Sequence, residues 1–81
     1  MSPEQVQGLI EAGIPGAEAR VESGDHVHFE AEVVSDRFQD LPLVGRHQLV
    51  YRCLGEHLRD QIHALSIKTY TRAEWTARHA G

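Results

Sequence analysis

The sequence predicts an α+β fold in which helix, strand, strand, helix, strand and helix follow one another around a mixed three-stranded sheet. Residues 27–35 alternate between apolar and polar side chains, as in a strand with one solvated face. Capping sequences at residues 2–5 and 71–74 mark helix starts near both ends of the chain. A helical segment separates the last two strand-like segments, so those strands are expected to pair in parallel. The 81 residues are expected to form one domain, 1–81.

The first half of the chain predicts one helix and a hairpin. A helix is expected over residues 3–12, because Ser2 can cap it, Pro3 suits its first position and Gly13 can end it. Residues 17–23 form a candidate strand, and the turn after it has the sequence Gly-Asp-His. The next strand is expected to place Val27, Phe29, Ala31 and Val33 on its core face and His28, Glu30 and Glu32 on its solvated face.

The second half predicts a long helix, a strand and a short helix. Residues 36–42 are expected to form a connecting segment with at most one helical turn. The longest helix is expected to follow, over residues 43–59. Its predicted apolar stripe contains Leu43, His47, Val50, Leu54 and Leu58, with Val44 and Tyr51 beside it. Residues 62–70 are predicted as the third strand, with Leu65 and Ile67 on one face. The last helix, 72–79, is expected to carry Trp75 inward.

Composition argues against several classes of protein. The net charge of −4 disfavours general binding to polyanions, because phosphate contacts dominate affinity for nucleic acids. A single cysteine, Cys53, excludes a disulfide framework within the chain and a multi-cysteine zinc site. The first residues do not resemble a signal peptide, and no apolar run approaches the ~20 residues of a membrane span. We therefore expect a cytoplasmic protein that does not bind membranes.

The chemistry-bearing residues leave several functions open. His63 lies where a charged segment becomes an apolar strand, and it could be a packed strand-end residue, a nucleic-acid contact, a catalytic base or a metal ligand. Cys53 and His57 have the i, i+4 spacing of a metal pair, but a lone cysteine beside an apolar stripe is usually a buried hydrophobic side chain. Cys53 with a histidine is also the one nucleophile–base candidate, and no oxyanion hole or phosphate loop accompanies it. We expect no enzymatic activity.

Two long segments resemble the BolA family. They are "FQDLPLVGRHQLVYRCLGEHL" and "IHALSIKTYTRAEW", and the likeness covers roughly residues 21–76. Asp40 stands where a glycine is common in that family. The resemblance implies a fold akin to the class II KH domain. It also implies that the protein binds a monothiol glutaredoxin and shares a bridging [2Fe–2S] cluster with it, with glutathione supplied on the glutaredoxin side. Alone, the chain is then expected to be a monomer or a weak homodimer.

The resemblance also assigns candidate ligands. His63 matches the histidine of the family's "HAL" motif, which ligates the cluster. The turn between the first two strands supplies a second ligand, either cysteine or histidine, and in this chain His28 is slightly favoured over His26. Imidazole can replace thiolate on one iron, as it does in Rieske centres.

The alternative function is that of a nucleic-acid-binding regulator. BolA-like proteins have been regarded as transcriptional regulators, and Arg46 and His47 begin the predicted long helix. Arg52 and Arg59 could extend a basic face, although acidic residues dilute it. Together with the net negative charge, this predicts at best weak, salt-sensitive DNA binding.

Overall fold

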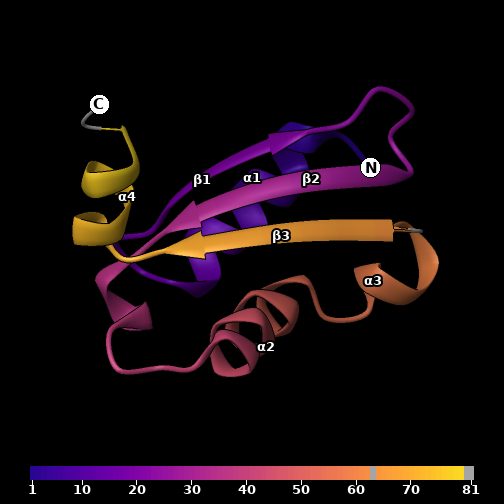
Figure 1. The fold of residues 1–81 in the computed structure, drawn as a ribbon. Coiled ribbons are helices and arrows are strands. Elements are labelled where there is room, and N and C mark those ends of the chain that lie inside the picture. The colour runs from indigo at the N-terminus through magenta and orange to yellow at the C-terminus, as the bar shows by residue number, and fades with distance from the viewer. Residues whose placement is uncertain (63, 80–81) are drawn as a thin grey trace.

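A three-stranded sheet forms the centre of the molecule. The computed structural model describes residues 1–62 and 64–79. The strands are β1 (Glu18–Glu22), β2 (His28–Val34) and β3 (Ala64–Tyr70), in the order β1-β2-β3 (Figure 1). β1 and β2 form an antiparallel hairpin, whereas β2 and β3 are parallel, with His28 opposite Ala64. The predicted mixed sheet is therefore confirmed.

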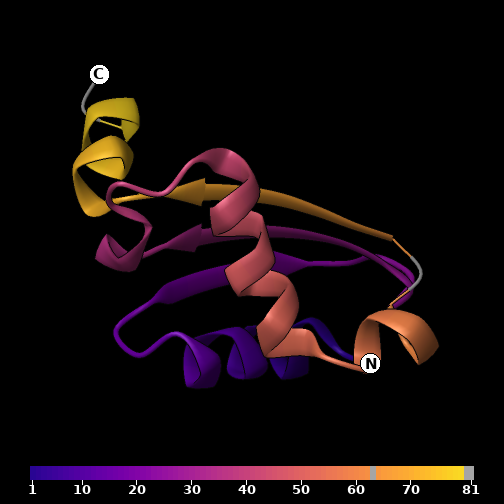
Figure 2. The ribbon, with the colours of Figure 1, turned by 90° about the horizontal axis from the view of Figure 1, so that it is seen from below.

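The helices are α1 (Pro3–Gly13), the 3-10 turn η1 (Asp36–Phe38), α2 (Leu43–Leu54), α3 (His57–Asp60) and α4 (Arg72–His79). α1 and α2 cover one face of the sheet, and α4 lies at the end where β3 finishes (Figures 1 and 2). Much of the other face is left to solvent. Among the described helices, none combines the length and the apolar run needed to cross a bilayer.

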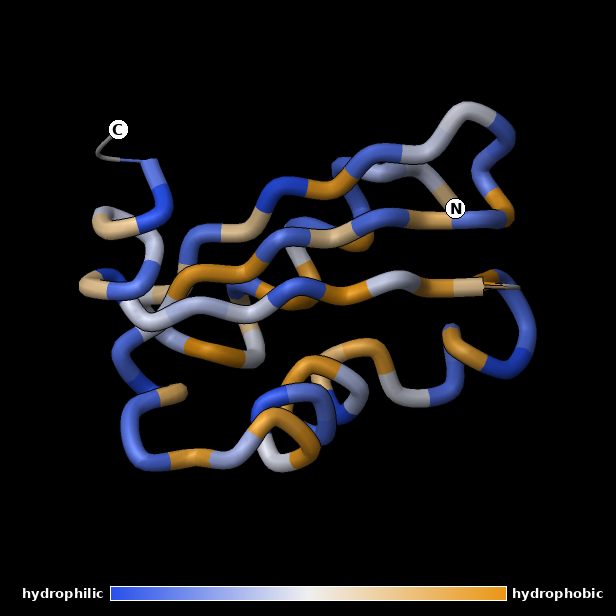
Figure 3. The backbone as a smooth tube through the Cα atoms, viewed as in Figure 1, coloured by the Kyte–Doolittle hydropathy of each residue, from blue (hydrophilic) through white to orange (hydrophobic). Residues whose placement is uncertain are grey.

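The core lies between the sheet and the two covering helices. Alternation along β2 (Figure 3) buries Phe29, Ala31 and Val33 on the helix-covered face. The same buried cluster takes Val6 and Ile10 from α1 and Val50 and Leu54 from α2, together with Ile14, Ala17, Ala19, Phe38 and Ile62. Because side chains alternate along a strand, the polar residues His28, Glu30 and Glu32 point to the opposite, open face.

Side-chain caps fix both terminal helices as predicted. At α1 the Ser2 hydroxyl accepts from the Gln5 N–H, and the Gln5 side chain accepts from the Ser2 N–H. At α4 the Thr71 hydroxyl accepts from the Glu74 N–H at 3.1 Å, and a Glu74 carboxylate oxygen accepts from the Thr71 N–H at 2.8 Å. Each cap satisfies backbone N–H groups that have no partner within the helix.

The prediction of one helix over residues 43–59 is wrong. α2 ends at Leu54, and Gly55 adopts a left-handed backbone with φ of 53°. Glycine takes this conformation without steric cost, so the chain turns there and restarts as α3 at His57. Asp40, in the loop before α2, is also left-handed (φ 66°), the region that favours glycine.

The predicted apolar stripe of the long helix is also wrong in its first turn. Leu43 and Val44 are 64% and 65% exposed, and Tyr51 is 41% exposed. The inward position of that turn belongs to Arg46, whose guanidinium lies over the Phe38 ring, 5.9 Å from its centroid. The stripe that contacts the core further along α2 is Leu49, Val50, Cys53 and Leu54.

Two other side chains lie outside the core that they were expected to join. Val27 is 40% exposed, because it precedes β2 and so falls outside the strand's alternation. Trp75 is only half-buried. It packs edge-on against Tyr70 at 5.3 Å, with Arg20 over its ring, at the end of the open sheet face.

Candidate metal centre

The turn between β1 and β2 is organised by one carboxylate and one hydroxyl. Asp25 Oδ1 accepts from the backbone N–H groups of Val27 and His28 at 2.9 and 2.8 Å. Ser23 Oγ accepts from the His26 N–H at 2.9 Å and donates to the His28 carbonyl at 2.5 Å. Side chains that bond their own backbone two or three residues on are typical of aspartate and serine turns. The turn therefore fixes where His28 enters the strand.

Asp25 also orients the His28 imidazole. The ring Nδ1 lies 2.7 Å from Asp25 Oδ2, and the two side chains are 61% and 54% exposed. A carboxylate only accepts, so Nδ1 is the nitrogen that donates to Asp25, and in a neutral ring with this tautomer Nε2 is the nitrogen with the lone pair. The His28 backbone N–H and then its ring hold the pKa of the Asp25 carboxyl well below its usual range.

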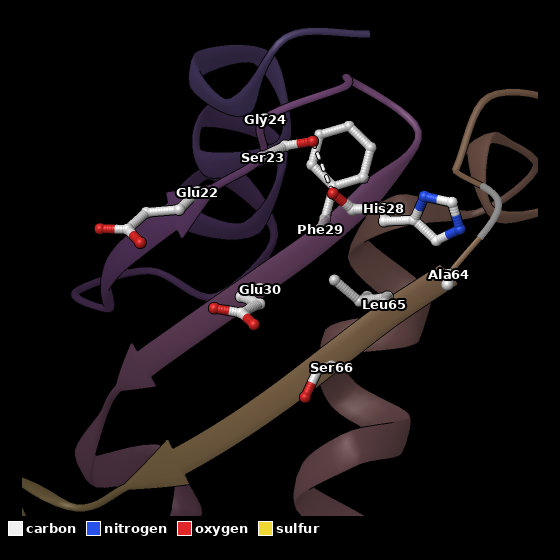
Figure 4. Close-up of a pocket in the computed structure, with 9 residues that line it drawn as sticks. All are labelled: Glu22, Ser23, Gly24, His28, Phe29, Glu30, Ala64, Leu65 and Ser66. Atoms are coloured by element: carbon white, nitrogen blue, oxygen red, sulfur yellow. Dashed lines mark hydrogen bonds between the residues drawn. The ribbon is translucent and has the colours of Figure 1, made fainter.

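His28 stands beside the start of β3. It pairs with Ala64 across the sheet, and the Ala64 N–H donates to the Val27 carbonyl at 3.3 Å. Figure 4 shows the ring extending from β2 toward Ala64. His63, the other predicted ligand, directly precedes Ala64 in the sequence but lies outside the described residues. Its predicted role stays a prediction.

The two histidines of the turn differ in how they are held. His26 has a left-handed backbone (φ 60°) and an exposed side chain, and its contact in the turn is made by its backbone N–H. His28 has a ring anchored by a carboxylate. Metal-ligating histidines commonly have such a partner, which fixes the tautomer and raises the basicity of the ligand nitrogen. Of the two histidines of the turn, only His28 therefore has the ring support that is typical of metal-ligating histidines.

Cys53 and His57 do not form a metal pair. They belong to different helices, since the chain turns at Gly55 between them. The Cys53 thiol contacts the Leu49 carbonyl at 3.2 Å, and burial raises its pKa. His57 Nδ1 instead lies 3.1 Å from Gln61 Oε1. Within residues 1–62 and 64–79, no three histidine, cysteine, aspartate or glutamate side chains are grouped so that they could hold a metal ion.

Arg46 is occupied by contacts within the fold. Its guanidinium forms a bidentate pair with Glu74, at 2.6 and 3.3 Å, and donates to the Leu41 carbonyl at 3.1 Å. Only 14% of the Arg46 side chain is exposed. The Arg46 side chain is the main reason that the pKa of Glu74 is lowered to about 2. This arginine is therefore a poor candidate for a phosphate contact.

His47 is half-buried and lies edge-on to Tyr51, with ring centroids 6.4 Å apart. Its Nε2 is buried and makes no hydrogen bond within the described part of the chain. The chain does contain a Gly-x-x-Gly spacing, at residues 13–16, and a loop with this spacing is what KH domains use to clamp nucleic acid. Here these residues end α1 and turn into β1, and the Gly16 carbonyl accepts from Arg72 at 2.9 Å.

Sequence reasoning missed Asp25 as the residue that orients His28. The signal was present in the sequence, because an aspartate in a turn can accept from the backbone N–H groups of the residues two and three positions further along, here Val27 and His28. It also missed the hollow beside His28, of about 500 Å³, lined by Glu22, Ser23, Gly24, His28, Phe29, Glu30, Ala64, Leu65 and Ser66 (Figure 4). No sequence pattern predicts that the three strands and the turn converge there.

Comparison with known proteins relates the chain to one family. A family model described as BolA-like protein matches residues 13–74. The DNA-binding transcriptional regulator BolA of Vibrio cholerae is 49% identical over 55 residues, which cover 68% of this chain and 52% of that protein. The human BolA-like protein 1 is 43% identical over 75 residues, covering 93% and 52%. The chain thus spans about half the length of these two relatives.

Solved structures agree with the fold. A BolA homologue from Coxiella burnetii superposes with a TM-score of 0.77 and 43% identity, covering 93% of this chain and 96% of that one. The BolA domain of SufE1 from Arabidopsis thaliana gives a TM-score of 0.79 and 34% identity, covering 89% and 93%. Yeast Fra2 superposes with a TM-score of 0.74 and 30% identity, covering 98% of this chain and 92% of that one.

Proposed function

This chain belongs to the BolA-like protein family, and from that premise we propose that it is a non-enzymatic adaptor that shares a bridging [2Fe–2S] cluster with a monothiol glutaredoxin. His63 and His28 are its ligands in this proposal. The partner's active-site thiolate and glutathione supply the other two.

The observation that supports the proposal best is the contact between Asp25 and His28. The carboxylate keeps the proton on Nδ1, and the ring projects from the sheet beside the first residue of β3. A half-exposed imidazole whose ligand nitrogen and orientation are fixed in advance is suited to bind a metal centre brought by another protein. Little reorganisation is then needed when the partner arrives.

The donor set of the chain fits a shared cluster better than one held by the chain alone. A [2Fe–2S] cluster takes four protein or thiol ligands, and the single cysteine is packed against α1. Two imidazoles from this chain leave two positions for thiolates from the partner and glutathione. Imidazole ligation raises the potential of such a cluster, so the mixed complex differs chemically from one with thiolates alone.

Visible circular dichroism tests the proposal. The chain is mixed with a monothiol glutaredoxin that carries its cluster and glutathione, and the spectrum is compared with that of the glutaredoxin alone. We expect a new spectrum at a 1:1 ratio for the parent chain and its loss for His28→Ala. An unchanged glutaredoxin spectrum with the parent chain would refute the proposal.

DNA binding is the second candidate, because the relative from Vibrio cholerae carries that activity in its name. We infer that it is the weaker candidate here. The Arg46 guanidinium is engaged by Glu74, and the chain carries a net charge of −4. A fluorescence-anisotropy titration with duplex DNA at physiological salt is expected to give weak binding that falls steeply as salt is added. Tight, sequence-selective binding would reverse the ranking.

A further inference from the structure

The open face of the sheet carries charged residues in rows that cross the strands. One row contains Arg20, Glu32 and Lys68, and the row next to it contains Glu22, Glu30 and Ser66. In the first row an acid lies between two bases, so its charges compensate one another. The second row has two acids and no base. His28 and Ala64 form the row beyond it, at the candidate metal centre.

Glu22 and Glu30 face each other directly across the antiparallel pair of β1 and β2. Side chains in such positions have Cβ atoms about 4.5–5.5 Å apart, and like charges placed there destabilise the sheet. Both residues are exposed, and the ion pairs found within residues 1–62 and 64–79 involve neither of them. The folded chain therefore carries an unfavourable carboxylate pair that a cation can relieve.

This pair lies within a continuous groove. The hollow of about 500 Å³ beside His28 shares Glu22, Glu30 and Ser66 with a second hollow of about 330 Å³, which reaches Arg20 and Lys68. Figure 4 shows the two carboxylates on the same side of the sheet, with the His28 ring further along. A protein that fills the hollow beside His28 also contacts the carboxylate pair, because Glu22 and Glu30 line the same hollow.

We propose that the Glu22–Glu30 pair receives a lysine or arginine side chain from the protein that docks at His28. This proposal rests on the proposed function, in which that protein is a monothiol glutaredoxin. An ammonium or guanidinium group can hydrogen-bond two carboxylates at once, and such charge-assisted bonds are the strong ones. No third histidine, cysteine, aspartate or glutamate joins the pair in the described part of the chain to make a metal site.

Charge-neutralising variants test the proposal. Association of a monothiol glutaredoxin with the parent, Glu22→Gln, Glu30→Gln and the double variant is measured by biolayer interferometry at low and high salt. Electrostatic steering acts mainly on the association rate and is screened by salt. We expect the double variant to associate about tenfold more slowly at low salt, with a much smaller difference at high salt. The matched control Glu4→Gln removes an exposed carboxylate from α1 and should stay within about twofold of the parent.

The outcomes separate this inference from the proposed function. If the parent chain itself forms no complex, the proposed function fails and this proposal fails with it. If the parent binds and the double variant associates at the parental rate at low salt, only this proposal is overturned. Thermal unfolding of the chains alone provides the check on folding. The two single variants and the double variant should unfold at or above the parental temperature. A marked fall would mean that the carboxylates stabilise the fold, which also overturns the proposal.

Discussion

The two ends of the sheet use their charged side chains in opposite ways. At the end where β2 and β3 finish, Arg46 reaches Glu74, and Arg72 reaches Glu18, so contacts join segments that are far apart in the chain. At the other end, the contacts of Asp25 and Ser23 remain within the β1–β2 turn. The first end holds the fold together, whereas the second shapes one short segment. Substitutions at the turn should therefore alter binding of the proposed cluster without unfolding the protein.

The strongest test of this contrast is His63→Ala. We expect the spectrum that is characteristic of the mixed complex to disappear, because one iron loses its imidazole, while the chain stays folded. Visible circular dichroism and urea unfolding measure the two effects. His26→Ala is the control and should leave both unchanged. A parental spectrum and cluster lifetime for His63→Ala would show that the ligand assignment is wrong.

Arg46→Ala should produce the opposite pattern. It removes the bidentate contact with Glu74 and the bond to the Leu41 carbonyl, and the side chain is only 14% exposed. We expect the free energy of unfolding to fall by about 2 kcal/mol, since hydrogen bonds to charged groups contribute about 1.5–3 kcal/mol. Urea denaturation measures this loss.

Arg52→Ala is the matched control for Arg46→Ala, because Arg52 is an exposed arginine of the same helix. It should change stability by less than about 0.5 kcal/mol. Below its unfolding transition, Arg46→Ala should still give the mixed-complex spectrum. Equal stability of the two variants would contradict the structural role assigned to Arg46.

Asp25→Asn is expected to have a smaller effect, confined to the site. The asparagine oxygen can still accept from the backbone N–H groups of Val27 and His28, but the negative charge that faces His28 Nδ1 is lost. Loss of such a supporting partner typically weakens a metal site 10- to 100-fold, so we expect a cluster lifetime shorter by about tenfold. The decay of visible absorbance under a chelator measures it. A parental lifetime would mean that the carboxylate does not orient the ligand.

The smallest effect concerns pH at the opposite end. The pKa of Glu74 is lowered from 4.5 to about 2 in the folded chain. Its contribution to stability is therefore complete above pH 4.5 and is lost as the pH falls toward 2. The stability difference between the parent and Glu74→Gln should shrink on acidification from pH 6 to about pH 3, as measured by urea unfolding. A difference that stays constant would place the pKa of Glu74 near its ordinary value.

Local patterns in the sequence predicted the order and type of the elements. The alternation in β2 and the two caps depend on residues close together in the chain, and these predictions are confirmed. The prediction of one long helix over residues 43–59 was wrong, because a single glycine with a left-handed backbone, Gly55, outweighs a favourable helical period. The prediction that Trp75 points into the core was wrong, because Trp75 packs against Arg20 and Tyr70 instead. The periodicity of apolar residues within α4 carries no information about these two contacts.

The candidate site was predicted less completely than the fold. His28 could be nominated from its place in the turn, but its orientation depends on Asp25, and its neighbour Ala64 comes from a distant strand. Arg46 resembled a surface base in the sequence because Glu74, its partner, lies 28 positions further along. Contacts between residues so far apart in the chain cannot be predicted from the spacing of residues within one segment.

The parallel pairing of β2 with β3 also determines when the site can exist. Residues 28 and 64 are far apart in the chain, and long-range pairings of this kind are slow steps in folding. During synthesis the turn with His28 leaves the ribosome well before Ala64 does. A nascent or truncated chain that ends before β3 lacks this corner of the sheet. In the proposed function, a cluster can therefore bind only to chains that have completed their synthesis and folded.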